Sequence, residues 1–288
     1  VGQSSTTSGY SSGGAYPQVN TIDKFTFAND ANATDVGDLT QIRDKAAGQS
    51  STESGYTSGG SIPPFSQSTT IDKFPFATDA NATDVGDLTQ ARYSAAGQSS
   101  SENGYTSGGV FPYTDTIDKF PFATDANATD VGDLTQARRS NSGFSSSSEG
   151  YNGGGFNGNQ VNTIDKFSFA SDGNASDVGN LIRNFSGMAG VQSTTHGYFM
   201  GGADPFPDEA IQKVSFSSGG NATDIADLTL ARENLGGGES STTHGYASGG
   251  VNSGVEDRID KTSFASDSNA TDVGNLISPV HIKAGHQV

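Results

Sequence analysis

Apolar residues occur along this chain in short runs that repeat about every 47 residues. The fullest unit, residues 95–138, reads AAGQSSSENGYTSGG, a variable stretch, TIDKFPF and then ATDANATDVGDLTQAR. Each unit holds four runs of β-forming residues, separated by turns rich in glycine, asparagine, aspartate and serine, which predicts four short strands. A Gly-Tyr pair marks the second run of six units, at Tyr10, Tyr56, Tyr105, Tyr151, Tyr198 and Tyr246.

The four runs differ in residue size, and this predicts where each lies. The first run is built from small residues, as in 95–100, which suits strands crowded around a central axis. The second ends in a glycine doublet, where the backbone can turn tightly. The third carries an aromatic residue in all six units, which we expect to fill the space between neighbouring units. Those aromatics are Phe27, Phe76, Phe122, Phe169, Phe216 and Phe264.

A glycine-rich tandem repeat of this length is typical of a closed β-propeller with one repeat per blade. We therefore predict an all-β fold, a single domain over residues 1–288 with six four-stranded antiparallel blades. Residues 284–288 and 1–5 both match the first run of a repeat. We expect these terminal strands to share a site in the last blade and close the ring, which removes open sheet edges. The alternative is a fragment of a longer array.

The repeat resembles the kelch-type repeat, in which an aromatic residue and a glycine doublet are followed by a third strand, a hairpin and an arginine. The doublets lie at 13–14, 59–60, 108–109, 154–155, 201–202 and 249–250, and the arginines are Arg43, Arg92, Arg138 and Arg232. The tryptophan usual in that family is absent. The resemblance implies a β-propeller. The near-identical repeats are also loosely similar to repetitive surface proteins of phages and marine microbes, which implies a virion or cell-surface component.

The amino-acid composition restricts the classes of partner that the protein can bind. The formal charge is -17, so a nucleic-acid backbone or an anionic membrane would be repelled. No apolar run approaches the roughly 18 residues that membrane insertion requires. The 17 phenylalanines and 9 tyrosines recur mostly at fixed repeat positions, which argues against disorder. An acidic, cysteine-free surface rich in serine, threonine and asparagine suits an extracellular, cell-surface or virion location.

The repeated Asp-Ala-Asn-Ala-Thr-Asp segment, as in residues 79–84, has two interpretations. Its alternating oxygen ligands resemble a calcium loop, but it lacks the glycine and distal glutamate of an EF-hand. Asp and Asn also favour hairpin turns. In the fifth repeat Gly219 replaces the first aspartate, which a turn tolerates better than a metal site. We therefore predict turns, with no metal and no cofactor. The accompanying Asn-X-Ser/Thr triplets are interpreted as part of the hairpin.

No arrangement of histidines, serines or acids indicates catalysis, so we predict a non-enzymatic protein. The segment between the glycine doublet and the third run varies most among repeats, and variable loops often form the binding face of repeat proteins. Aromatic residues there could contact ligands or cap the blades, and the four arginines could contact ligands or brace neighbouring blades. The aromatic residues are Tyr16, Phe65, Phe111, Tyr113, Phe156 and Phe206.

These observations predict a recognition or adhesion module that binds a glycan or a protein through one face, alone or within a larger assembly. One alternative is a purely structural assembly subunit. Another is an enzyme resembling propeller oxidases or sialidases, which would need a non-repeating cluster of metal ligands or acids at the axis.

Overall fold

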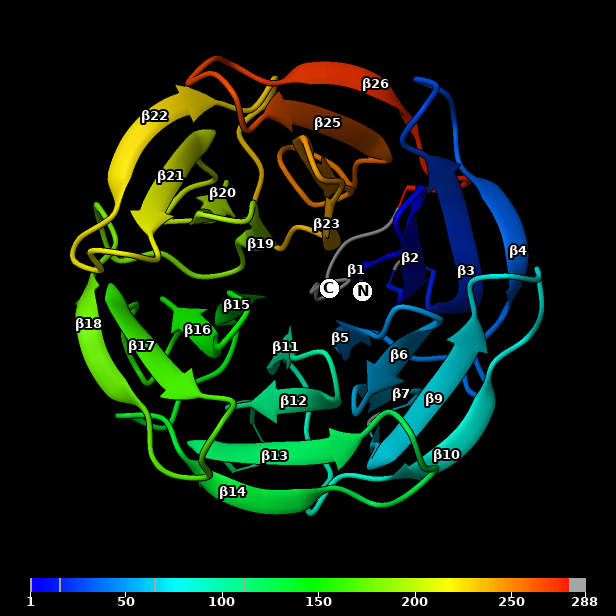
Figure 1. The fold of residues 1–288 in the computed structure, drawn as a ribbon. Helices are drawn as coiled ribbons and strands as arrows, with labels where there is room; N and C mark the ends of the chain where they lie inside the picture. Colours follow the sequence, from blue (N-terminus) through cyan, green and yellow to red (C-terminus); the bar gives the residue numbers. More distant parts are fainter. Residues whose placement is uncertain (1, 16, 65, 111, 280–288) are drawn as a thin grey trace.

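The structure is a computed structural model that describes residues 2–15, 17–64, 66–110 and 112–279. Within these residues the fold is all-β and contains no helix. Six four-stranded antiparallel sheets form a ring around a central axis, as shown in Figure 1. The predicted six-bladed propeller is confirmed.

Each blade consists of four strands whose order from the axis outward follows their order in the sequence. The innermost strands are β1 (Gly2–Ser4), β5 (Ala47–Ser50), β11 (Ala96–Ser99), β15 (Ser142–Ser145), β19 (Ala189–Gln192) and β23 (Gly237–Ser240). The second strands are β2 (Ser8–Gly14), β6 (Ser54–Ser58), β12 (Asn103–Ser107), β16 (Glu149–Gly153), β20 (His196–Met200) and β24 (His244–Ser248).

The third strands are β3 (Val19–Thr26), β9 (Thr70–Pro75), β13 (Thr116–Pro121), β17 (Thr163–Ser168), β21 (Ala210–Ser215) and β25 (Arg258–Ser263). The outermost strands are β4 (Thr34–Asp38), β10 (Thr83–Asp87), β14 (Thr129–Asp133), β18 (Ser176–Asn180), β22 (Thr223–Asp227) and β26 (Thr271–Asn275). Blade 2 also carries a small hairpin of β7 (Ser61–Ile62) and β8 (Ser66–Gln67) between its second and third strands.

The antiparallel order sorts the connections onto two faces. Turns between the first and second strands, and between the third and fourth, lie at one end of the blades, which we call the turn face. Connections between the second and third strands, and from each fourth strand to the next blade, lie at the other end, which we call the loop face. The variable segments therefore share the loop face, as the sequence predicted.

Aromatic stacking joins each blade to the next. Tyr56 of blade 2 stacks on Phe122 of blade 3, with ring centroids 4.7 Å apart. The ring closes in the same way, because Tyr246 of blade 6 stacks on Phe27 of blade 1 at 4.9 Å. The other pairs are Tyr10–Phe76, Tyr105–Phe169, Tyr151–Phe216 and Tyr198–Phe264. The predicted aromatic filling between blades is confirmed.

The glycine before the tyrosine makes room for a second ring in most blades. A Cβ atom on Gly104 would lie 2.4 Å from Cζ of Phe120, the first aromatic of the third strand. Phe120 in turn packs at 5.6 Å against Tyr56 of the preceding blade. In blades 1 to 4 the glycine of the Gly-Tyr pair thus leaves room for this second ring, whereas the equivalent glycines of blades 5 and 6 face Phe144 and Val191.

Buried arginines form a second link between blades. The Arg43 guanidinium lies 2.8 Å from the carboxylate of Asp72 in blade 2, and both side chains are fully buried. The backbone N–H and hydroxyl of Thr40 donate to the same carboxylate at 2.9 and 2.6 Å. The equivalent ion pairs are Arg92–Asp118, Arg138–Asp165 and Arg232–Asp260.

Between blades 4 and 5 both members of this pair are replaced together. Phe185 occupies the arginine position and is fully buried, and Gln212 occupies the aspartate position. The Gln212 amide oxygen accepts the N–H of Ile182 at 2.9 Å. The paired replacement avoids leaving one buried charge without its partner, which would be costly.

Within residues 2–279 the ring closes without exchange of strands between the first and last blades. The N-terminal residues form β1, which pairs with β2 and is therefore the innermost strand of blade 1 rather than of blade 6. The Ser240 N–H donates to the Ser4 hydroxyl at 3.0 Å, and the Asn275 N–H donates to the Asn32 side chain at 3.1 Å. The predicted C-terminal strand, residues 284–288, lies outside the described residues.

We predict that Arg92→Met destabilises the protein more than the double variant Arg92→Phe/Asp118→Gln. The single variant leaves the Asp118 carboxylate buried without its guanidinium, a loss of about 3–5 kcal/mol, whereas the double variant copies the junction of blades 4 and 5. Thermal unfolding followed by circular dichroism measures the difference. Equal or greater destabilisation in the double variant would contradict the interpretation.

We also predict a loss of stability at alkaline pH. Burial raises the pKa of Tyr105 and of Tyr246 to about 12, above the ordinary value of about 10. The folded state therefore holds the neutral phenol while the unfolded state ionises. This contribution to stability is complete below pH 10 and is lost as the pH rises through 12. Thermal melts across this interval should show a steady decline, and a constant melting temperature would refute the prediction.

Candidate functional site

The central axis opens into a pocket on each face of the propeller. The turn-face pocket has a volume of about 680 Å³ and is lined by residues from all six blades. The loop-face pocket has a volume of about 210 Å³ and lies among the connections that lead from one blade to the next. These two pockets are the candidate sites, and they differ in chemistry.

The loop-face pocket is built from five successive blade connections and from the segment between β16 and β17 of blade 4. Its lining residues are Lys45, Ser94, Arg139, Ser140, Phe156, Ser186 and Asn234. The connections hydrogen-bond to one another around the axis. Ser94 N–H donates to the Lys45 carbonyl at 2.7 Å, and Ser140 N–H donates to the Ser94 carbonyl at 2.8 Å.

These connections share an unusual backbone conformation. Lys45, Ser94, Ser140 and Asn234 have φ angles of 55°, 56°, 54° and 49°, in the left-handed region. This conformation is uncommon for residues other than glycine. The hydrogen bonds between connections hold it in place, and the pocket wall is therefore fixed by the backbone.

Arg139 is the most distinctive residue of the loop-face pocket. Its guanidinium carbon lies 5.3 Å from the ring centroid of Phe156 and 6.0 Å from that of Tyr113. Its backbone also forms a bridge with Phe156, with N–H to carbonyl distances of 3.0 and 2.8 Å. We call Arg139, Tyr113 and Phe156 the Arg139 cluster. It presents a cation and two aromatic rings on one face.

A second cation lies at the same pocket. Lys45 lines it, and the Lys45 ammonium lies 5.2 Å from the ring centroid of Tyr93. Glu233 lies in the connection from blade 5 to blade 6, and burial raises the pKa of its carboxyl group. The corresponding positions in the repeats are Asp44, Tyr93, Arg139, Ser186 and Glu233. The loop-face mouth therefore varies from repeat to repeat although the fold does not.

The predicted aromatic residues have different positions. Tyr113 is partly exposed and Phe156 is half-buried, and both belong to the Arg139 cluster. Phe206 is 78 % exposed in the second connection of blade 5 and does not line either pocket. Tyr16, Phe65 and Phe111 lie outside the described residues.

The four predicted arginines are not on the surface. Arg43, Arg92, Arg138 and Arg232 are buried, and each forms an ion pair with an aspartate of the next blade. These contacts favour the bracing interpretation over ligand contact. The arginine that lines a pocket is instead Arg139. Its sequence signal is the Arg138-Arg139 doublet, at a position that no other repeat fills with arginine.

The Asp-Asn hairpins connect the third and fourth strands and join neighbouring blades. Lys24 of blade 1 pairs at 2.9 Å with Asp79, the first aspartate of the blade 2 hairpin. Asn81 of that hairpin accepts the N–H of Asp38 at 3.1 Å. In blade 5 the aspartate is replaced by Gly219, and Lys166 pairs with Glu149 instead. The lysine of the repeated Asp-Lys sequence on the third strand thus links one blade to the next hairpin at five junctions.

Among the described residues, no group of three or more histidine, cysteine or acidic side chains is arranged to hold a metal ion. The same part of the chain contains no helix long and apolar enough to cross a membrane. The chain matches no known family in a comparison with protein-family models, and no curated protein is similar to it.

We predict that calcium leaves the thermal stability unchanged. The first aspartate of each hairpin is already neutralised by a lysine in five blades, so a cation would have to compete with an existing ion pair. Melting temperatures measured with excess calcium and with chelator should coincide. A rise in melting temperature with calcium that reverses on chelation would show that the hairpins bind metal.

Proposed function

We propose that this protein is a non-enzymatic recognition module, related to kelch-type propellers, that binds a carboxylate-bearing glycan or protein segment at the loop-face pocket. The observation that supports this most strongly is the Arg139 cluster, together with Lys45, at one mouth of the axis. Two cations gather there on a protein whose net charge is -17.

The chemistry of the pocket suits a carboxylate attached to a ring or a chain. A guanidinium can donate two parallel hydrogen bonds to a carboxylate. The rings of Tyr113 and Phe156 offer apolar surface, on which a sugar ring or a side chain can pack. Ser94, Ser140 and Asn234 add hydrogen-bonding groups on the same wall. The volume of about 210 Å³ fits one residue of a longer ligand.

The overall charge adds selectivity. A polyanion such as a nucleic acid would be repelled by the acidic body, whereas a single carboxylate can reach the local cations. This argument supports an extracellular, cell-surface or virion role in which the propeller recognises acidic glycans or acidic protein partners. Repetitive surface proteins of phages and marine microbes provide the analogy for such a role.

We predict that Arg139→Gln lowers affinity for acidic glycans at least tenfold. The change removes the cation and the bidentate donor but keeps the backbone bridge to Phe156. A glycan array that contains both acidic and neutral sugars identifies the ligand, and calorimetry measures the affinity. Because the interaction is ionic, binding by the native protein should also weaken as salt increases.

Arg183→Gln is the matched control. Arg183 is also exposed on the loop face, lies 5.0 Å above the ring of Phe185 and pairs with Asp208, but it does not line the pocket. Binding that is equally reduced in both variants, or unchanged in Arg139→Gln, would contradict the proposal. Absence of any ligand together with self-association of the protein would favour the structural-subunit alternative.

A further inference from the structure

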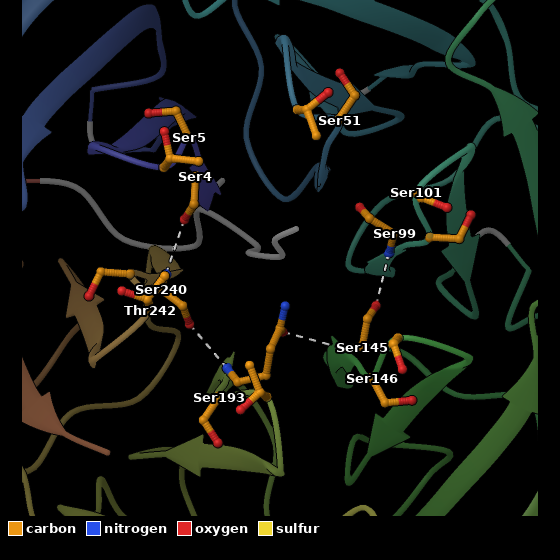
Figure 2. A pocket seen from close by; sticks show the side chains of 17 residues that line it. Ser4, Ser5, Ser51, Ser99, Ser101, Ser145, Ser146, Ser193, Ser240 and Thr242 are labelled. Atoms are coloured by element: carbon orange, nitrogen blue, oxygen red, sulfur yellow. Dashed lines mark hydrogen bonds between the residues drawn. The ribbon is translucent and has the colours of Figure 1, made fainter. Parts of the chain in front are cut away.

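The turn-face pocket has a composition unlike the rest of the surface. Seventeen residues line it, and all are serine or threonine except Gln192. They come from the inner strands and first turns of all six blades, and Figure 2 shows their side chains around the central opening. The volume of about 680 Å³ lies within the usual range of small-molecule sites, about 300–1,000 Å³.

The inner strands around the base of this pocket are joined by a closed circle of hydrogen bonds. Each inner strand donates one backbone N–H to a side-chain oxygen of the next blade, and the sixth bond returns to the first blade. The six donor–acceptor pairs are Ser4–Ser50, Ser50–Ser99, Ser99–Ser145, Ser145–Gln192, Gln192–Ser240 and Ser240–Ser4, at 3.0 to 3.3 Å. The spacing of the blades around the pocket is therefore fixed.

The second layer holds the turns in place. The Ser51 hydroxyl accepts the N–H groups of Glu53 and Ser54 at 3.2 and 3.0 Å and donates to the Ser54 carbonyl at 3.3 Å. The same turn motif occurs at Ser5, Ser100, Ser146, Ser193 and Ser241. These hydroxyls maintain the shape of the turns, and this function occupies their hydrogen-bonding capacity.

The outer layer is exposed and lies at the turn tips. It consists of Thr6, Thr52, Ser101, Ser147, Thr194 and Thr242. Each hydroxyl can donate one hydrogen bond and accept two. Because the layers beneath fix the turns, the backbone that carries these hydroxyls is already in place, which would lower the entropy lost when a ligand binds.

Gln192 breaks the sixfold symmetry of the pocket. It replaces the serine found at this position in the other five repeats, and its amide oxygen accepts the Ser145 N–H at 3.3 Å. The amide NH₂ group adds a pair of donors at a single point of the ring. This asymmetry gives a bound ligand a preferred orientation.

We infer that the turn-face pocket is a second binding site, which takes an uncharged, hydroxyl-rich ligand such as a neutral saccharide. The lining side chains carry no charge that could compensate the desolvation of an ion. Hydroxyl groups act as both donors and acceptors, as the hydroxyls of a sugar do. The site lies on the face opposite the loop-face pocket and does not depend on the function proposed there.

Saturation-transfer NMR with maltose, cellobiose and lactose at millimolar concentration tests this inference. We expect transfer to at least one disaccharide, with no change between low and high salt. The double variant Ser101→Leu/Ser147→Leu should reduce the transfer at least fivefold, because it removes two tip hydroxyls and narrows the pocket. Gln192→Ser, which copies the other five repeats, should weaken the discrimination among the three sugars.

Two controls separate this site from others. Ser171→Leu alters an exposed serine of a hairpin on the same face but outside the pocket, and it should leave the transfer unchanged. Arg139→Gln should leave it unchanged as well, since Arg139 lies on the loop face. Absence of transfer from all three sugars, or transfer that persists in the double leucine variant, would overturn the inference.

Discussion

The contact between neighbouring blades is the interaction on which this structure depends. At each of the six junctions a tyrosine of one blade stacks on a phenylalanine of the next, and an asparagine side chain accepts a backbone N–H from the preceding blade. An aromatic pair contributes about 0.5–1.5 kcal/mol beyond the area it buries. No single contact is large, but the ring repeats them and then closes on itself, so no blade lacks a neighbour.

Circular closure explains why the repeats are so alike and where they are free to differ. Residues that face the next blade must match a partner that is itself repeated, and at the junction of blades 4 and 5 both members of such a pair have changed together, to Phe185 and Gln212. Residues at the mouth of the axis have no such constraint. Asp44, Tyr93, Arg139, Ser186 and Glu233 occupy equivalent positions with different chemistry. Recognition can therefore vary without disturbing the fold.

Much of the fold could be predicted from the sequence because its signals are local and repeated. Strand order, blade number and the role of Phe122 and its equivalents all follow from a pattern that appears six times. The direction of the arginine side chains could not be predicted in this way. Arg138 and Arg139 are adjacent, yet one is buried against Asp165 and the other lines the loop-face pocket. Only the path of the backbone between blades decides which of them is covered.

The turn-face pocket is a second feature that could not be predicted from the sequence. Serines and threonines near the axis were expected as small residues that allow strands to crowd together. In the ring, six turns that are distant in the sequence surround one cavity, so these serines and threonines together line a pocket. The two pockets thus differ in kind: the loop-face pocket has cations and an aromatic ring in its lining, and the turn-face pocket is lined by neutral hydroxyl groups and one amide.

A crystal structure of the protein soaked with a disaccharide that contains glucuronic acid tests the central claim most directly. The account predicts density for the sugar in the loop-face pocket, with its carboxylate against the Arg139 guanidinium and its ring against Phe156 or Tyr113. Density for the carboxylate elsewhere on the propeller, or an empty loop-face pocket at saturating ligand, would contradict it.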